Sequence, residues 1–273
     1  MFANIKSFLF PNKRFTLKTL IKFSLQITSK LNLGIDLGNT LAKFFLFDGD
    51  KIILQQKVNY SSFESKIDIL IRENSDIKAI IYADVSRKIG KILEKYSNNV
   101  KLIPVNSRMH LPFINSYQSK GSLGNDRIVL AAAACKSYPK SNVLVVDMGT
   151  CITYDFIDEK NIYQGGAISP GFVMRYKALN HFTANLPIVE YKTPKNPQGK
   201  NTHDCIQSGV YFAILDEITA RIEYYKKNYE SLIVILTGGD ANKLPKTLKN
   251  SIFANSNFIA GGLLHLLKLN IDS

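Results

Sequence analysis

The sequence predicts an α/β protein made of two similar halves, and three observations lead to this prediction. An apolar run that ends in Asp-x-Gly and a small polar residue occurs twice, within residues 33–43 and 145–153. Each copy is followed by β-branched segments and then by stretches with helical periodicity. The chain of 273 residues is long enough to hold two domains of ordinary size. Internal duplication is the most economical explanation of this pattern.

In the first half we expect three antiparallel strands followed by a helix, a strand, a helix and a strand. The Asp48-Gly49-Asp50 sequence indicates a hairpin between the second and third strands. Ser62 is a candidate cap for the first helix, because apolar residues recur after it at helical spacing. The expected strands are 31–36, 41–47, 51–58, 77–82 and 100–105, and the expected helices are 61–73 and 87–96.

The same order of strands begins again in the second half. Residues 109–120 lack periodicity and contain Pro112, so we expect a loop or lid before it. The next helix has a small-residue face at 131–134 that suits close packing, and Pro139 ends it. We expect helices at 124–138, 170–185, 202–228 and 258–269, with Pro170 in the first turn of the second of these. The expected strands are 143–147, 151–157, 162–165 and 232–236, and residues 187–200 are expected to form a surface loop.

Each Asp-x-Gly turn is a candidate floor for a phosphate site. A buried strand that delivers a carboxylate into a tight glycine turn places backbone N–H groups beside a possible metal ligand. Two such floors, with Asp36 and Asp147, would form a nucleotide clamp if they face each other. The alternative is an ordinary hairpin turn in which glycine supplies a positive φ. The sequence has no Walker phosphate loop and no Gly-x-Gly-x-x-Gly fingerprint, so a nucleotide site depends on the paired turns. The glycine pairs at 238–239 and 261–262 would let backbone approach a flat ligand such as adenine.

Composition limits the classes of partner. The formal net charge is +13, of which residues 1–30 supply +6 without any acid. The remaining charge is spread over expected surface helices, so we expect attraction for anionic substrates and no nucleic-acid binding. No apolar run approaches the roughly 18 residues of a membrane span, and we expect no membrane partner. The three cysteines are widely spaced, which argues against disulfides or a zinc site and favours the reducing cytoplasm.

Residues 1–30 form a basic N-terminal extension outside the expected fold. Lysines interleave with its apolar residues, which is typical of a transit-type segment or an interfacial amphipathic helix rather than a secretory signal. The alternative, which we prefer, is a disordered extension or an upstream start codon that adds residues the fold does not use. We therefore divide the chain into 1–30, an N-terminal domain at 31–138 and a C-terminal domain at 139–273.

Over about residues 31–269 the sequence resembles the type III pantothenate kinases, within the acetate and sugar kinase, heat-shock ATPase and actin superfamily. The resemblance rests on five motifs in the family's order: Asp36-Leu37-Gly38-Asn39-Thr40, Gly124-Asn125-Asp126-Arg127, Asp147-Met148-Gly149-Thr150, the run Gly165-Gly166-Ala167-Ile168-Ser169-Pro170-Gly171, and Thr237-Gly238-Gly239. It implies two ribonuclease-H-like (actin-like ATPase) domains, each a five-stranded mixed sheet flanked by helices. It also implies a homodimer, with the helix from Thr202 and the small-residue helix after Asp126 as candidates for the interface.

The resemblance further implies ATP-dependent phosphorylation of pantothenate to 4'-phosphopantothenate, the first step of coenzyme A biosynthesis. Asp126 would be the general base, Asp36 would lie near Mg²⁺, and Asp147 would help to hold a monovalent cation, K⁺ or NH₄⁺. The implied ATP-binding residues are Asp36, Leu37, Gly38, Asn39, Thr40, Leu41, Ala42, Lys43 and Thr150, and the implied pantothenate-binding residues are Tyr117, Gly124, Asn125, Asp126, Arg127 and Thr202. Asn125 replaces the family's commoner Ala and Cys151 follows the second Gly-Thr, but neither departure removes a reacting group.

These implied roles agree with the chemistry of the residues. Phosphoryl transfer needs positioning and charge neutralisation more than covalent help, so a magnesium ion, backbone donors and one base are sufficient. The attacking hydroxyl must lose its proton, and a carboxylate fixed in the first turn of a helix, such as Asp126, is well placed to accept it. The planar fork of Arg127 suits a carboxylate or a phosphate. Its alternative role is an ion pair that pins the helix.

Two other functions remain open at this point. One is a transcription accessory factor of the same family without kinase activity, which only the basic charge supports. The other is a superfamily kinase or phosphatase that acts on a sugar, a polyphosphate or another small hydroxyl substrate. Tyr117 and the helix that opens with Gly-x-Asp-Arg argue against it.

Overall fold

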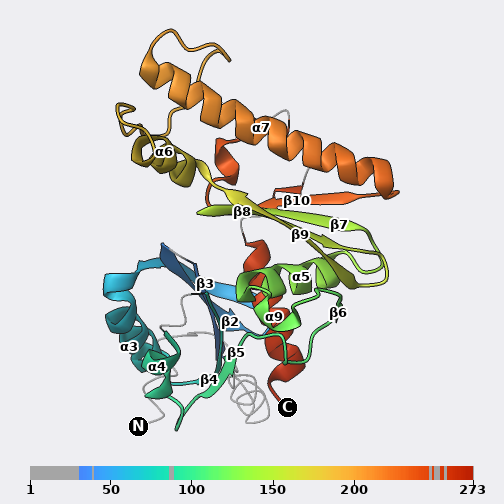
Figure 1. Cartoon of the computed structure of the whole chain (residues 1–273). Helices are drawn as coiled ribbons and strands as arrows, with labels where there is room; N and C mark the ends of the chain where they lie inside the picture. The colour runs from blue at the N-terminus through green and yellow to red at the C-terminus, as the bar shows by residue number, and fades with distance from the viewer. Residues whose placement is uncertain are drawn as a thin grey trace, which may run out of the picture.

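The structure of the chain is a computed structural model that describes residues 31–38, 40–85, 89–245, 248, 253–254 and 257–272. The expected extension 1–30 and Asn39 lie outside these described residues. Helices cover the outer face of each of two sheets and also fill the space between the sheets (Figure 1).

The first sheet is formed by the N-terminal strands. In the described residues it contains β1 (Leu31–Leu37), β2 (Leu41–Asp48), β3 (Lys51–Asn59), β4 (Ile77–Asp84) and β5 (Lys101–Pro104), in the order β3-β2-β1-β4-β5. The hairpin strands β1, β2 and β3 pair antiparallel, whereas β4 and β5 add in parallel. Parallel strands need a crossover, and α3 (Phe63–Glu73) and α4 (Ile89–Glu94) occupy the two crossovers.

The second sheet repeats this arrangement. It contains β7 (Val143–Met148), β8 (Cys151–Ile157), β9 (Ile162–Pro170), β10 (Ile233–Thr237) and the two-residue β11 (Phe253–Ala254), with β7, β8 and β9 antiparallel and β10 and β11 parallel. A sixth strand, β6 (Ile114–Asn115), joins at the edge beside β9, so the order is β11-β10-β7-β8-β9-β6. The predicted pair of five-stranded mixed sheets is confirmed, and β6 comes from the segment expected to be a loop.

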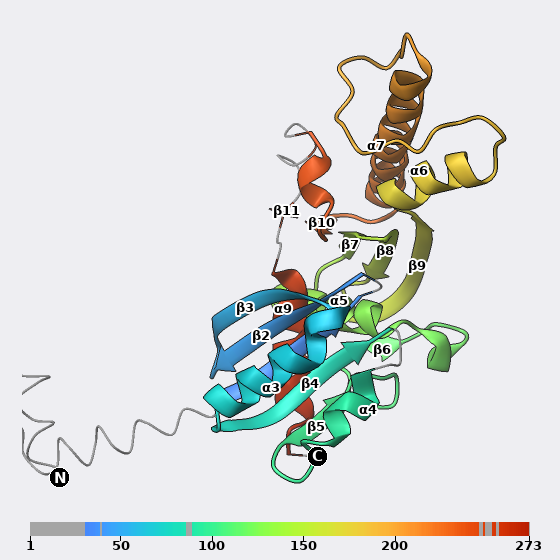
Figure 2. The same ribbon diagram turned by 90° about the vertical axis from the view of Figure 1, so that its left-hand side faces the viewer.

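The central strands β1 and β7 are largely apolar on both faces because both faces are covered. Along β7, Val143 and Val145 point to the interior between the sheets, whereas Leu144 and Val146 point to the outer face. That outer face packs against α6 (Phe172–His181) and the 27-residue α7 (Thr202–Asn228), at the end of the molecule away from α3 and α4 (Figure 2). Within the described part of the chain, no helix combines the length and apolarity that a bilayer crossing requires.

Two helices, α5 (Asn125–Ser137) and α9 (Phe258–Asn270), lie side by side between the sheets (Figure 1). Their close approach depends on Gly262, because a Cβ at that position would lie 2.1 Å from the carbonyl oxygen of Val129. Residues 127–135 of α5 are all buried within the single chain. The expectation that α5 forms a dimer interface is therefore wrong, because its small-residue face is used for internal packing.

The two halves of the sequence exchange elements. The C-terminal helix α9 contacts β1 and β4 of the first sheet, and β6 of the first half pairs with β9. The boundaries 31–138 and 139–273 thus divide the sequence, but elements of each half pack against the sheet of the other half.

Strand β9 is longer than expected. It continues through the 165–171 run to Pro170, and Gly171 is the cap residue of α6, which ends at His181 rather than at 185. The glycines signal a tight strand rather than a turn: Gly165 has φ +107°, and a Cβ on Gly166 would lie 1.6 Å from the carbonyl oxygen of Tyr154 on β8. The expected end of the strand at 165 and the helix start at Pro170 were therefore wrong.

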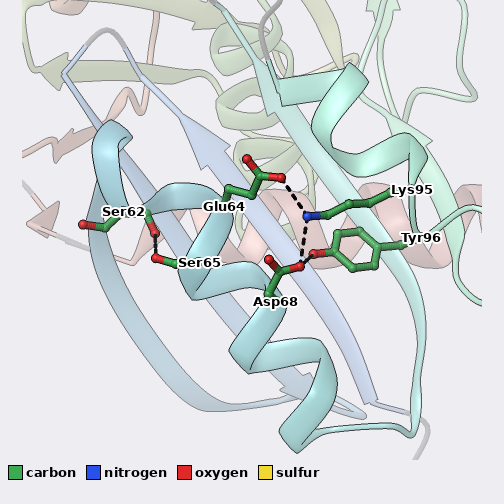
Figure 3. Close-up of polar contacts among 6 residues, drawn as sticks. All are labelled: Ser62, Glu64, Ser65, Asp68, Lys95 and Tyr96. Atoms are coloured by element: carbon green, nitrogen blue, oxygen red, sulfur yellow. Dashed lines mark hydrogen bonds and ion pairs between the residues drawn. The ribbon is translucent and has the colours of Figure 1, made fainter.

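A polar network joins α3 to the segment after α4 at the surface (Figure 3). Lys95 Nζ donates to Glu64 Oε1 at 2.9 Å and lies 3.0 Å from Asp68 Oδ1, and the Tyr96 hydroxyl also donates to Asp68. The hydrogen bond from Tyr96, together with Lys95, lowers the pKa of the Asp68 carboxyl. Exposed ion pairs contribute little to stability, so α3 is held mainly by burial of its apolar face, Phe63, Ile67 and Leu70.

The contact between α5 and α9 can be tested with two adjacent glycines. Gly262→Ala should lower the free energy of unfolding by about 1–3 kcal/mol, because the added methyl group collides with the Val129 carbonyl. Gly261→Ala is the matched control: its Cβ would meet nothing within 4 Å, and alanine is better than glycine in a helix by about 0.5–1 kcal/mol. Equal unfolding midpoints of the two variants in urea would contradict this account.

Candidate active site

Three carboxylates from different elements surround one lysine. Asp36 and Asp147 hold equivalent positions, each one residue before the end of the central strand of its sheet, and Asp126 lies in the first turn of α5. Lys43 lies opposite Asp36 on β2, and its Nζ is 2.9 Å from Asp36 Oδ2. Burial by itself would lower the pKa of Lys43, but Asp36 first, and then Asp147 and Asp126, raise it above its ordinary value. Lys43 therefore stays protonated at the centre of these acids.

The two Asp-x-Gly turns meet, as the clamp interpretation requires. The Gly38 N–H donates to the Leu41 carbonyl at 3.1 Å, and the Gly149 N–H donates to the Cys151 carbonyl at 2.9 Å. The hydroxyl oxygens of Thr40 and Thr150, one from each turn, lie 3.3 Å apart. Both threonines are exposed, so their hydroxyl groups are accessible to a ligand.

Two of the sequence motifs converge on the second turn. The Gly171 N–H donates to the Thr150 carbonyl at 3.0 Å, and a Cβ at 171 would lie 2.4 Å from the Gly149 carbonyl oxygen. Gly238 has φ +96°, and a Cβ there would lie 2.4 Å from Asp147 Oδ1. These glycines are therefore needed for packing around the turn.

The expectation that glycine pairs allow a flat ligand to approach applies to only one member of each pair. Gly238 and Gly262 fit closely against protein atoms, whereas a Cβ added at Gly239 or Gly261 would have no neighbour within 4 Å. Space for an adenine remains a prediction at Gly239 and Gly261.

Burial raises the pKa of two of these acids. Burial raises the pKa of Asp147 to about 7, with Asp36 and Asp126 adding repulsion and Lys43 opposing it. Burial also raises the pKa of Asp126, against the hydrogen bond from the Arg127 N–H to its Oδ1 at 2.9 Å. Two acids with raised pKa values beside a protonated lysine are typical of a site that binds cations or transfers protons.

The Gly-x-Asp-Arg motif has a local structural cause. Gly124 precedes α5, and a Cβ there would lie 2.6 Å from Asp126 Oδ1, so a larger residue would displace this carboxylate from its present position. The Asn125 side chain reaches the Asp84 carbonyl at 3.4 Å and so links α5 to the end of β4.

Arg127 is buried beside an acid that the sequence analysis missed. Its Nε donates to Asp155 Oδ1 at 2.7 Å, and the rings of Tyr117 and Tyr163 lie 5.9 Å from its guanidinium carbon. Asp155 is completely buried in β8. The signal was present in the sequence, because an acid within the apolar strand Cys-Ile-Thr-Tyr-Asp-Phe-Ile needs a buried partner.

The structure does not bring Thr202 to these residues. Thr202 begins α7 on the outer face of the second sheet, whereas α5 and Arg127 lie on the inner face. Thr202 instead lines a separate hollow of about 1020 Å³ between α6 and α7. Among the expected ATP-binding residues, Leu37 and Ala42 are fully buried, so neither presents surface to a nucleotide in this structure.

Asp36, Asp126 and Asp147 could hold a metal ion only together with other ligands. In the described ranges, no group of three or more His, Cys, Asp or Glu side chains is arranged to bind a metal by itself. This fits Mg²⁺, which is usually held by one or two carboxylates together with substrate phosphates and water.

Comparisons with known proteins identify the family. Residues 32–224 match the family model described as type III pantothenate kinase. A type III pantothenate kinase from Flavobacterium psychrophilum is 42% identical over 234 residues, which cover 86% of this chain and 97% of the relative, and one from Christiangramia forsetii is 40% identical over 240 residues, covering 88% and 99%.

Solved structures show the same fold at lower identity. A Campylobacter jejuni protein assigned by name to the Baf family of transcriptional activators superposes with a TM-score of 0.59 at 24% identity, covering 88% of this chain and 100% of that one. Lmo2764 from Listeria monocytogenes, named as an N-acetylmannosamine kinase, gives 0.51 at 12% identity, with coverage of 87% and 99%. The family match spans both Asp-x-Gly turns, the helix that opens with Gly-x-Asp-Arg and the start of α7, and the chain belongs to the type III pantothenate kinase family.

Proposed function

We propose that this protein transfers the γ-phosphoryl group of ATP to pantothenate, forming 4'-phosphopantothenate in the first step of coenzyme A biosynthesis. The observation that carries the proposal is the convergence of both Asp-x-Gly turns and Asp126 on Lys43, in a chain of the type III pantothenate kinase family. No Walker loop is needed, because two glycine turns and a lysine supply the N–H groups and the positive charge for the phosphates.

In this proposal the ATP phosphates lie between the turns that carry Thr40 and Thr150. Lys43 neutralises phosphate charge, and Gly38 and Leu41 contribute through the backbone beside Asn39. Leu37 and Ala42, which pair across β1 and β2, hold this turn in place from beneath. A magnesium ion held by Asp36 and the phosphates would neutralise the charge that develops on the transferred group. A monovalent cation, K⁺ or NH₄⁺, would be held at Asp147, where a positive charge favours the ionised carboxylate.

Asp126 is the proposed general base. The hydroxyl of pantothenate loses its proton as it attacks the γ-phosphate, and the raised pKa of Asp126 makes it a stronger proton acceptor than an exposed carboxylate. Arg127 would bind the carboxylate of pantothenate, with Tyr117, Gly124 and Asn125 lining the same pocket.

We also propose a homodimer that works in the cytoplasm. The exposed apolar side chains of α6 and the residue after it, Val173, Met174 and Phe182, support an interface on that side of the second sheet. Thr202 lies on this side, so it would reach a pantothenate pocket only in a second copy of the chain.

The three free cysteines, Cys135, Cys151 and Cys205, fit a reducing compartment. No specific observation supports a transcription accessory role or a different acceptor substrate.

The direct test is a coupled assay of ADP release. The purified protein should release ADP only when ATP, pantothenate and Mg²⁺ are all present, and K⁺ should increase the rate. Glucose and N-acetylmannosamine are the control acceptors for other kinases of this fold. Absence of a pantothenate-dependent signal in K⁺ and Mg²⁺ would end the proposal.

Replacement of the base should separate chemistry from binding. Asp126→Asn should lower kcat by roughly 10²–10⁴-fold, the usual contribution of a positioned acid or base. ATP affinity by calorimetry should stay near wild type, and the thermal midpoint should stay at or above that of wild type, because asparagine replaces a carboxylate whose pKa burial raises. Asp216→Asn, which makes the same change at an exposed position of α7, is the matched control and should retain activity. Near-normal turnover in Asp126→Asn would remove Asp126 as the base.

The raised pKa of Asp147 predicts a pH-dependent stability in the absence of Mg²⁺ and K⁺. The folded state keeps the proton up to about pH 7, whereas the unfolded state releases it near 3.8, so stability from this group is lost as pH rises between these values. Asp147→Asn stays neutral over this range. Its free energy of unfolding in urea, relative to wild type, should therefore rise between about pH 4 and 7, because the folded wild type binds about one more proton there than the unfolded wild type. The exposed Asp216→Asn should follow wild type. A difference between Asp147→Asn and wild type that does not change with pH would contradict the shift.

A further inference from the structure

We propose that Asp155 is a positioning residue for substrate recognition: it holds Arg127 by the Nε edge, so that the unpaired Nη2 group is kept in place as the donor for the substrate's carboxylate. This inference rests on the proposed function, because it takes the substrate to be an anionic small molecule bound beside Asp126. It adds a residue that lies outside the five motifs.

The carboxylate of Asp155 is fully occupied within the protein. Its Oδ1 accepts from Arg127 Nε at 2.7 Å and from the Tyr163 hydroxyl at 2.7 Å, and its Oδ2 accepts from the Thr153 hydroxyl at 3.0 Å. These donors come from α5, β9 and β8, so the carboxylate is fixed from three elements. A group held in this way has one orientation and imposes it on the guanidinium that it binds.

The Nη2 group, at the other end of the guanidinium, has no hydrogen-bond acceptor in the part of the chain that the structure describes. Arg127 is only 5% exposed, and its Nη2 has no hydrogen-bond partner in the described residues. A buried donor on a charged group costs free energy unless it finds an acceptor. Strand β9 passes close to this nitrogen, because a Cβ on Gly166 would lie 3.1 Å from Nη2 and 1.6 Å from the Tyr154 carbonyl oxygen. The Tyr117 and Tyr163 rings lie 5.9 Å from the guanidinium carbon and offer only their faces, so this nitrogen still lacks an acceptor among the described side chains and backbone.

Stability alone gives a poor account of the pair. The desolvation of two buried charges often cancels their attraction, and apolar residues of similar volume frequently serve as well. The alternative, an ion pair that only pins α5 to the second sheet, explains the Nε bond but leaves Nη2 unexplained. A role in orienting a donor explains both ends of the guanidinium.

The test compares Asp155→Asn with wild type in the full chain. Asparagine keeps the volume and can still accept from Nε, but it lacks the charge that fixes the guanidinium. We expect the KM and the calorimetric Kd for pantothenate to rise by about 10- to 100-fold, the effect of a hydrogen bond to a charged group. The KM for ATP should stay within about threefold of wild type, because the nucleotide contacts lie on other elements.

A second readout uses an analogue of pantothenate in which an alcohol replaces the carboxylate. Wild type should prefer pantothenate strongly over this analogue in kcat/KM, and Asp155→Asn should lose most of that preference. Glu217→Gln is the matched control, because it removes the acid from another arginine pair, Arg175–Glu217, on the outer side of the same sheet. It should leave the preference unchanged.

Different results contradict different parts of the argument. A folded Asp155→Asn with wild-type Kd and preference, or with equal losses for ATP and pantothenate, would overturn the inference. If Asp155→Asn does not fold, Tyr163→Phe decides: it removes one donor to Asp155 while keeping the ring, and it should shift the pantothenate Kd in the same direction, whereas no shift overturns the inference. Wild type that binds pantothenate without phosphorylating it would instead overturn the proposed function, and the Kd comparison would still test Asp155.

Discussion

The structure depends on the burial of α5 between the two sheets. A helix in that position has no face toward solvent, so its side chains must be small wherever another element approaches. The run Ala131–Ala134 meets this requirement, and Gly262 on α9 allows the two helix backbones to come together at Val129. Because α5 is fixed on all sides, Asp126 and Arg127 in its first turn are presented at the place where the sheets' Asp-x-Gly turns meet. The packing constraint and the chemistry are thus parts of one arrangement.

The charged residues of the candidate site form two separate ion pairs. Lys43 is bound to Asp36, and Arg127 is bound to Asp155. Asp126 and Asp147 are left without a direct basic partner among the ion pairs of the described residues, and burial raises the pKa of both. An acid that accepts a proton and an acid that meets a cation are what phosphoryl transfer with metal assistance requires. The same imbalance makes the ligand-free protein sensitive to pH.

Much of the site follows from local sequence signals. A carboxylate before a glycine at the end of an apolar strand can be recognised by pattern, and the structure does bring Thr40 and Thr150 together. The signals that failed depend on distant neighbours. The 165–171 run looks like a turn because it is rich in glycine and contains proline, but its glycines let a strand pass close to Tyr154 and Arg127. Asp155 was missed because its partner is 28 positions away in the sequence.

The sequence by itself determined the duplicated α/β order, the two Asp-x-Gly turns and the helix that begins with Gly-x-Asp-Arg, because strand periodicity, turn chemistry and capping act over a few residues. Only the tertiary structure decided that α5 is internal, that α9 returns to the first sheet, and that Thr202 and Arg127 lie on opposite faces of the second sheet. These features depend on which surfaces are buried against each other. Contacts between residues far apart in the chain decide that, and no local pattern records them.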